Sequence, residues 1–129
     1  MAEYQSLARF RRALRVFLHF SETAAREAGL TPAQHQLMLA VKGWEGARPP
    51  SIGDLAATLL LRHHSTVELV SRGEEAGMVV RRPDDLDGRR QRVHLTARGE
   101  EKLARLSALH REELRRFRRR TAEDLLPLG

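Results

Sequence analysis

The sequence contains no cysteine, which excludes disulfide bonds, thiolate-bound zinc, cysteine nucleophiles and thiol-based redox sensing. It also lacks a long hydrophobic run. The longest, Leu55–Leu61, is far shorter than the roughly 20 residues that a transmembrane helix needs. Aromatic residues make up only 5% of the 129-residue chain. We therefore expect no membrane span, no signal peptide and a cytoplasmic location.

Lysine is nearly absent as well. The chain carries 23 basic residues, of which only Lys42 and Lys102 are lysine, against 17 acidic residues, so its net charge is +6. Codon usage in a GC-rich genome explains the preference for arginine as well as any function does. It does not explain the excess of positive charge, which favours a polyanionic partner such as nucleic acid or a membrane surface.

Hydrophobic spacing predicts a long helix at each end of the chain. Apolar and small residues recur every three or four positions across residues 4–28, and Gly29 follows as a helix stop. Thr96 is placed to cap a second long helix with the same periodicity. The two apolar stripes consist of Leu7, Phe10, Leu14 and Phe17 in the first helix and of Leu103, Leu106, Leu114 and Phe117 in the last.

Shorter helices and one hairpin are predicted between them. Thr31-Pro-Ala-Gln34 and Ser51-Ile-Gly-Asp54 both have the spacing of a capping box, in which two side chains satisfy free backbone N–H groups. Residues 62–76 form a further helix that ends at Gly77. Residues 78–82 and 91–96 then alternate apolar and polar positions, and a turn-rich segment joins them as a hairpin.

This order of elements predicts a fold class that is mostly α with a small β-hairpin: a winged helix-turn-helix flanked by long N- and C-terminal helices. So small a winged core cannot cover the apolar stripes of both long helices. We expect a second copy of the chain to bury them, which gives a two-fold homodimer.

Three stretches of the chain resemble the MarR family of bacterial transcription regulators. Residues 30–34 are similar to the opening of the family's second helix, and residues 51–56 with 61–70 are similar to its helix-turn-helix. Residues 87–99 fit the family's wing pattern D-x-R-x-x-x-V-x-L-T-x-x-G at every fixed position.

The resemblance implies a single MarR-like domain over residues 1–129. Residues 30–98 would bind DNA, and residues 1–29 and 99–129 would form the dimer. It further implies a homodimer that binds a palindromic operator in double-stranded DNA, usually represses a nearby gene and is released by a small-molecule effector. It implies no cofactor and no membrane partner.

Two positions depart from the family's pattern. Related sequences usually have an acidic residue at the position of Ser71 and a leucine at the position of Gly73. The acidic residue is thought to orient a wing arginine in some relatives, so that link is missing here. Gly73 falls on the buried side of the predicted recognition helix, so either neighbouring side chains fill the space or the helix is loosely held.

The start of the predicted recognition helix carries the first candidate DNA-binding residues. The N-terminal end of such a helix enters the major groove, and its free N–H groups favour phosphate. A solvated first turn is the alternative. Adjacent histidines without acids or thiols nearby bind metal weakly, so no metal site is predicted. The candidates are Arg62, His63, His64, Ser65 and Thr66.

Arg72 and the tip of the wing supply the remaining candidates. Arg72 reaches DNA in one interpretation and pairs with Glu68, four residues earlier, in the other. In the wing, Arg89 is expected to enter the minor groove with Asp87 holding its guanidinium and Arg90 beside it. An ordinary charged turn is the alternative for these three residues.

Other charged and titratable residues lie on the long helices. His19 and His110 are weak candidates for an effector site, and a satisfied, partly buried histidine is the commoner role. The arginine clusters either contact DNA backbone or an acidic ligand, or form solvated faces paired with acids of the partner chain. They consist of Arg9, Arg11, Arg12 and Arg15, and of Arg105, Arg111, Arg115, Arg116, Arg118, Arg119 and Arg120.

Two functions of different classes follow. The first is a dimeric, sequence-specific DNA-binding transcription regulator. The second is a non-specific basic nucleic-acid-binding protein, architectural or RNA-associated, that uses its arginine-rich helices. We predict no enzyme, because the sequence shows no catalytic triad order, phosphate-cradling glycine loop or metal-binding histidine pair.

Overall fold

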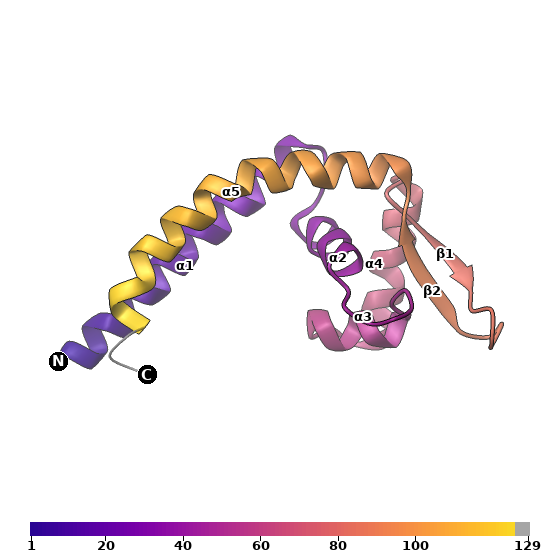
Figure 1. Cartoon of the computed structure of the whole chain (residues 1–129), viewed down its shortest axis with the longest axis horizontal. Coiled ribbons are helices and arrows are strands. Elements are labelled where there is room, and N and C mark those ends of the chain that lie inside the picture. The colour runs from indigo at the N-terminus through magenta and orange to yellow at the C-terminus, as the bar shows by residue number, and fades with distance from the viewer. Residues whose placement is uncertain (126–129) are drawn as a thin grey trace. The chain divides into compact units, whose positions relative to one another are not determined.

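The computed structural model describes residues 1–125, so positions 126–129 of the predicted dimer-forming part lie outside the described residues. Five helices and one hairpin follow one another, as Figure 1 shows. The predicted fold class, a winged helix-turn-helix flanked by two long helices, is confirmed. In order, the elements are α1 (Ala2–Glu27), α2 (Pro32–Lys42), α3 (Ile52–Leu59), α4 (His63–Glu75), β1 (Val79–Pro83), β2 (Gln91–Leu95) and α5 (Ala97–Leu125).

The chain divides into two compact units. One, here called the terminal-helix unit, contains Met1–Gly29 together with the chain from Arg105 onward. The other, here called the winged unit, contains Leu30–Ala104. No described helix of either unit is long and apolar enough to cross a membrane.

Both predicted capping boxes are present. At the start of α2, the Gln34 N–H donates to the Thr31 hydroxyl and the Thr31 N–H donates to the Gln34 side chain, each at 3.1 Å. At the start of α3, Ser51 and Asp54 make the same exchange at 3.0 and 3.1 Å. These reciprocal bonds fix where the two helices begin.

Among the described residues, three in the left-handed region end helices or turn the chain. Gly29 and Gly77 have φ values of 82° and 78° and follow α1 and α4, as the sequence predicts. Leu60, at the end of α3, has a φ of 57° although it is not glycine. Its side chain is 91% exposed, so packing within the described chain does not explain this conformation.

The hairpin pairs β1 with β2 in antiparallel register, from Val79 opposite Leu95 to Pro83 opposite Gln91. An isolated antiparallel β-bridge joins Arg92 of β2 to Ser51, the residue before α3, so the wing is tied to the start of α3. After β2, the Gly99 N–H donates to the Thr96 hydroxyl at 3.0 Å, which confirms Thr96 as the cap of α5.

The core of the winged unit is made by side chains that are 2% exposed or less. The core residues are Leu37, Met38, Leu55, Val70, Met78, Val79 and Val93.

A Cβ at Gly99 would overlap the Met78 carbonyl, so only glycine allows this close approach of α5 to the chain before β1.

The space beside Gly73 is filled rather than empty. A Cβ at this position would lie 2.8 Å from Val79 Cγ2 and 3.5 Å from Leu37 Cδ2. Of the two alternatives left open by the sequence, filling by neighbours therefore holds. A cavity beside Gly73 is therefore excluded.

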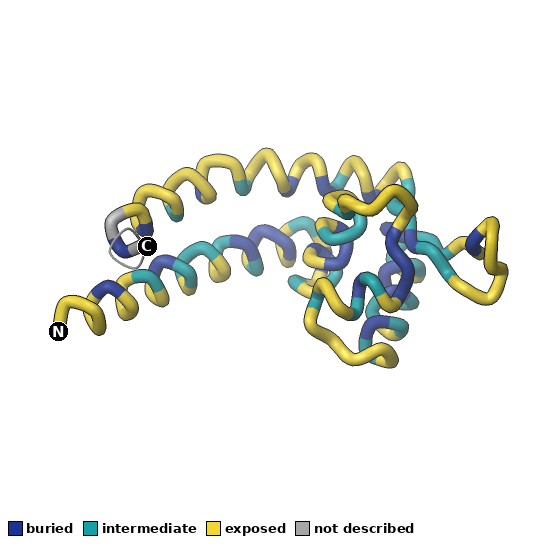
Figure 2. The backbone as a smooth tube through the Cα atoms, turned by 60° about the horizontal axis from the view of Figure 1, so that its bottom comes forward, coloured by how far each residue is buried: buried dark blue, intermediate teal, exposed yellow. Residues whose placement is uncertain are grey.

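In the terminal-helix unit, α1 and α5 run antiparallel and meet through aromatic rings. The ring of Phe17 lies 5.5 Å from that of Phe117 and 6.1 Å from that of His110. Further along, the Arg9 Nε lies 2.9 Å from an Asp124 carboxylate oxygen. Figure 2 shows exposed residues recurring along both helices between buried ones.

Candidate nucleic-acid interface

The start of α4 differs from the starts of α2 and α3. Arg62 is its N-cap, and within the described residues no side chain caps the helix. The N–H groups of its first turn are therefore left for another partner. Arg62, His63 and His64 are exposed and Ser65 is partly buried. Four of the five predicted residues are therefore accessible to a ligand at this helix end.

Thr66, the fifth predicted residue, does not reach the surface. Its side chain is fully buried, and its hydroxyl donates to the Arg62 carbonyl at 3.0 Å. Thr66 thus supports the backbone of the N-cap. A hydroxyl buried in this way cannot touch DNA.

Arg72 is exposed, and in the part of the chain that the structure describes it forms no ion pair with Glu68. The alternative of an internal pair at four-residue spacing is therefore not realised. Arg72 lies two turns beyond the start of α4, apart from the cluster at its N-terminal end.

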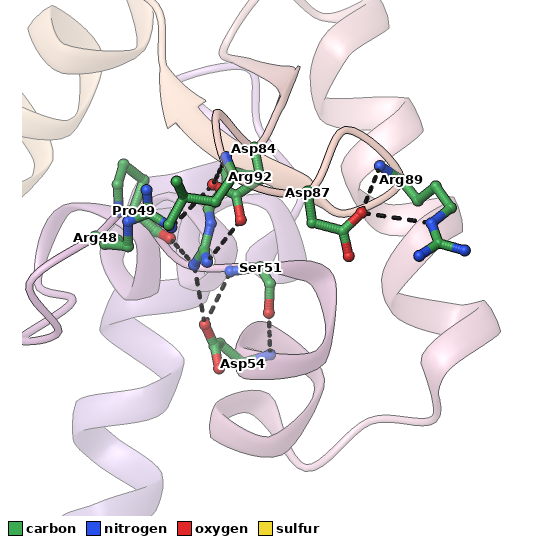
Figure 3. A network of polar contacts seen from close by, with 9 residues as sticks. Arg48, Pro49, Ser51, Asp54, Asp84, Asp87, Arg89 and Arg92 are labelled. Atoms are coloured by element: carbon green, nitrogen blue, oxygen red, sulfur yellow. Dashed lines mark hydrogen bonds and ion pairs between the residues drawn. The ribbon is translucent and has the colours of Figure 1, made fainter.

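At the wing tip, Asp87 and Arg89 are joined as predicted (Figure 3). One carboxylate oxygen of Asp87 accepts the Arg89 backbone N–H at 3.1 Å and lies 3.5 Å from its Nε. The Arg89 side chain is nevertheless 95% exposed. The Asp87 carboxylate thus lies at the base of the guanidinium, whose outer donors stay open to a ligand.

One groove of about 500 Å³ joins these two regions. Its walls come from α4, from the start of α3 and from the hairpin. The structure thereby brings predicted residues that are distant in sequence to one face of the winged unit. Among its lining residues are His63 and Val67 of α4, Gly53 of α3, and Asp87, Arg89 and Arg90 of the hairpin.

The recognition helix is linked to the wing by a pair that the sequence analysis missed. Glu74 of α4 accepts the Arg81 Nε at 2.8 Å and its backbone N–H at 3.0 Å. An acidic residue of α4 is therefore paired with the hairpin at Glu74, one turn after Ser71. No local spacing rule would reveal this pair, because it joins the end of a helix to a strand beyond a turn.

A second missed cluster surrounds Asp84, which follows β1. Arg92 Nη2 lies 3.3 Å from one Asp84 oxygen and Arg48 Nη1 lies 3.1 Å from the other. Burial by itself raises the pKa of the Asp84 carboxyl. Hydrogen bonds from Arg92 and the Leu86 N–H, with the charges of Arg48 and Arg92, outweigh it and lower that pKa.

His110 is held inside the terminal-helix unit. Its Nδ1 lies 2.6 Å from the Leu106 carbonyl, which can only accept, so we assign the ring proton to Nδ1. Its Nε2 lies 2.9 Å from the Ser21 hydroxyl. His19 is exposed. Within the described residues no group of three or more possible metal ligands comes together.

Many arginines of α5 pair with acids of the same chain. Glu112 lies within 3.9 Å of Arg115, Arg116 and Arg119. A hydrogen bond from Arg115 is the main cause that lowers the pKa of Glu112, against the opposing effect of burial. The buried Glu113 pairs with Arg116 and Arg120. Part of the dense positive charge is therefore neutralised locally.

The winged unit combines an uncapped helix start with a basic hairpin, and the Glu74–Arg81 pair joins the two. These features are typical of a winged helix-turn-helix protein of the DNA-binding class. Its sequence matches the profile of the MarR family over residues 28–90. The chain is similar to this family over that stretch and has the fold of its transcription regulators. No curated protein sequence matches it.

Three solved structures share the fold. AbsC from Streptomyces coelicolor is 24% identical, with 91% of this chain and 80% of AbsC covered and a TM-score of 0.73. CouR from Rhodococcus jostii RHA1, bound to p-coumaroyl-CoA, is 25% identical over 80% of this chain and 71% of CouR, with a TM-score of 0.69. S. aureus MepR in a DNA complex is 18% identical over 79% of this chain and 77% of MepR, with a TM-score of 0.66.

Proposed function

We propose that the protein is a sequence-specific transcription regulator that binds a palindromic operator in double-stranded DNA as a homodimer. The groove that brings His63 of α4 together with Arg89 and Arg90 of the wing carries this proposal. One rigid unit thereby presents a helix to the major groove and a hairpin arginine to the neighbouring minor groove.

Each part of the interface has a distinct role. The free N–H groups at the start of α4 and the side chain of Arg62 hold a phosphate, while His63, His64 and Ser65 face base edges. Arg89 enters the minor groove, whose negative potential is strongest where the groove is narrow. Arg90 and Arg72 provide further positive charge against the backbone.

The terminal helices support the dimer. Leu7, Leu18, Leu109 and Leu114 remain exposed in the isolated chain, to between 44% and 58%. Burying them against a second copy would remove apolar surface from water. Residues 30–98 would then bind DNA, and residues 1–29 and 99–129 would dimerise.

We further infer that a small molecule releases the operator and that the protein acts as a repressor. The CouR complex supports this, since that relative binds an acyl-CoA ligand. His19 and His110 remain candidates for contacts with such an effector. Isothermal titration with small organic acids and acyl-CoA esters, followed by operator release, tests this part.

The decisive experiment compares a selected operator with random duplex DNA. Selection from random oligonucleotides supplies the operator, and binding is measured over a range of salt. We expect the operator to bind at least about 10³-fold more tightly than random DNA. Equal affinity for both would support the alternative, a non-specific basic nucleic-acid-binding protein.

Arg89→Ala should weaken operator binding by about 1–3 kcal/mol per half-site and leave dimerisation intact. Arg82→Ala is the matched control, because Arg82 is an exposed arginine on β1 of the same hairpin. Asp87→Ala deletes a negative charge, which alone would tighten binding. It should instead weaken binding, since Asp87 orients Arg89. Tighter binding of Asp87→Ala with no effect of Arg89→Ala would refute the wing contact.

A further inference from the structure

Arg92 joins the base of the wing to the start of α3. Its Nη1 donates to the Pro49 carbonyl at 2.8 Å, and its Nη2 lies 3.3 Å from Asp84 (Figure 3). Nη1 also lies 3.9 Å from the carboxylate of Asp54, which belongs to the α3 capping box. One guanidinium thus reaches the wing loop, the segment before α3 and α3 itself.

The two central side chains of this cluster are withdrawn from solvent, whereas those of Arg48 and Asp54 are 41% and 38% exposed. Those of Arg92 and Asp84 are only 12% and 7% exposed. Within the described residues, the buried Arg92 Nε has no hydrogen-bond partner. A buried, incompletely satisfied ion pair is a poor source of stability, but it defines one geometry. A positional role therefore explains the cluster better than a stabilising one.

Asp84 passes this restraint on to the loop that carries Arg89. The Asp84 N–H donates to the Arg90 carbonyl at 2.8 Å, and the Arg90 N–H donates to the Asp87 carbonyl at 2.9 Å. Asp87 in turn holds Arg89. A continuous chain of contacts therefore runs from the Pro49 carbonyl through Arg92 and Asp84 to the wing tip.

On the opposite side of the hairpin, the Glu74–Arg81 pair ties β1 to α4. The base of the wing is thus fixed on both sides, whereas the Arg89 guanidinium is exposed. Simultaneous contact with two grooves requires a set separation between the start of α4 and the wing tip. Fixing that separation before binding avoids the entropy cost of ordering the loop on DNA.

We propose that Arg92, acting through Asp84, is a positioning residue that sets where Arg89 meets DNA. This inference rests on the DNA-binding function proposed above. Arg92 itself touches no DNA in this arrangement. Its removal should leave the charge of Arg89 in place but allow the tip to sample positions that miss the groove.

Hydrogen exchange of the free protein tests the restraint without DNA. In Arg92→Gln, the Asp84 and Arg90 amides should exchange about tenfold faster or more, because the loop opens locally. Arg82→Gln is the matched control, since Arg82 lies directly opposite Arg92 in the hairpin register and is exposed. Unchanged exchange in Arg92→Gln would overturn the proposal.

A double-mutant cycle on operator DNA tests the coupling to Arg89. Arg89→Ala should weaken binding about tenfold or more in the wild-type background. In the Arg92→Gln background the same substitution should weaken operator binding less than about threefold, because a misplaced Arg89 contributes little to binding. Additive effects would overturn the positioning role alone. No effect of Arg89→Ala in either background would overturn the wing contact of the proposed function as well.

Two conservative variants keep the test sound if Arg92→Gln fails to fold. Arg92→Lys retains the charge but cannot bridge the Pro49 carbonyl and Asp84 together, so its operator affinity should be intermediate. Asp84→Asn removes a negative charge, which alone would tighten DNA binding, yet it should weaken binding by releasing the loop. Tighter binding by Asp84→Asn, or wild-type affinity in Arg92→Lys, would contradict the proposal.

Discussion

The two units of the chain treat their apolar residues differently. The winged unit buries Leu37, Leu55 and Val70 completely. It also exposes leucines, such as Leu60 and Leu86 at 91% and 82%, but these lie outside its core. The terminal-helix unit buries Leu106 but leaves Leu7 and Leu114 about half exposed, at 53% and 45%. The first therefore has a core of its own, while the second presents apolar surface that a partner could cover.

Both units also contain buried ion pairs, such as Arg92–Asp84 in the winged unit. In the terminal-helix unit, Glu113 and Asp124 are buried and paired with arginines of the neighbouring turn or helix. Buried ion pairs fix register more than they stabilise, since both charges lose water. The Arg9–Asp124 pair, which joins α1 to α5, therefore favours one register of the two helices more than it adds stability. This is consistent with the proposed role of a second copy.

The largest expected effect contrasts Leu55 with Leu114. Leu55→Ala should lower the free energy of unfolding by about 2–5 kcal/mol, because it opens a cavity in the winged core. Leu114→Ala should cost much less in the isolated chain and should instead raise the dissociation constant of the dimer. Urea unfolding measures the first effect and sedimentation the second.

The contrast would collapse under either of two results. If Leu114→Ala destabilised the fold as much as Leu55→Ala, the terminal-helix unit would have a core of its own. A well-folded wild-type monomer at micromolar concentration would show that the exposed leucines need no second chain.

A smaller effect is expected at Gly73, within the core of the winged unit. Gly73→Leu should lower the melting temperature, because even a Cβ would meet Val79 at 2.8 Å and overpacking costs about 1–3 kcal/mol. Gly73→Ala should follow in the same direction. Gly88→Leu is the matched control, since a Cβ at position 88 meets nothing within 4 Å. A higher melting temperature for Gly73→Leu would show that the site has room after all.

These cases also mark what the sequence could reveal. The capping boxes at Thr31 and Ser51, the stop at Gly77 and the cap at Thr96 depend on neighbouring residues, so their spacing predicted them. The joining of Asp87 to Arg89 was predictable for the same reason. Local chemistry was sufficient wherever the partners lie within a few positions.

Contacts between distant segments were not predictable. The filled space beside Gly73 depends on Val79, and the Arg92 cluster depends on Pro49 and Asp84, which the hairpin register brings close. The burial of Thr66 was equally hidden, because helical periodicity alone did not distinguish a groove-facing from a core-facing hydroxyl. Tertiary packing decides these cases.

A modest effect is expected at Thr66. Thr66→Val removes the hydroxyl that donates to the Arg62 carbonyl and should cost about 0.5–1.5 kcal/mol of stability. The Arg62 carbonyl still accepts the Thr66 backbone N–H, so it is not left unpaired. Operator affinity should stay within about twofold of wild type once folding is complete. A loss as large as that of Arg89→Ala would mean that Thr66 contacts DNA.

The smallest expected effect is a dependence on acid that involves Asp84 of the winged unit. Its pKa is lowered in the folded state from an ordinary value of about 3.9, so folding favours the charged carboxylate. The resulting stabilisation is complete above that ordinary value and is lost as the pH falls through the lower, folded-state pKa. Asp84→Asn lacks this stabilisation at every pH.

The difference in free energy of unfolding between wild type and Asp84→Asn should therefore be largest near pH 7 and shrink below about pH 4. Urea unfolding from pH 7 to pH 3 measures this, with Glu112→Gln as the counterpart in the terminal-helix unit, where the carboxylate is half exposed and solvent screens its arginines. A difference that grows toward low pH would mean that Asp84 is destabilised by its burial rather than held by Arg92 and Arg48.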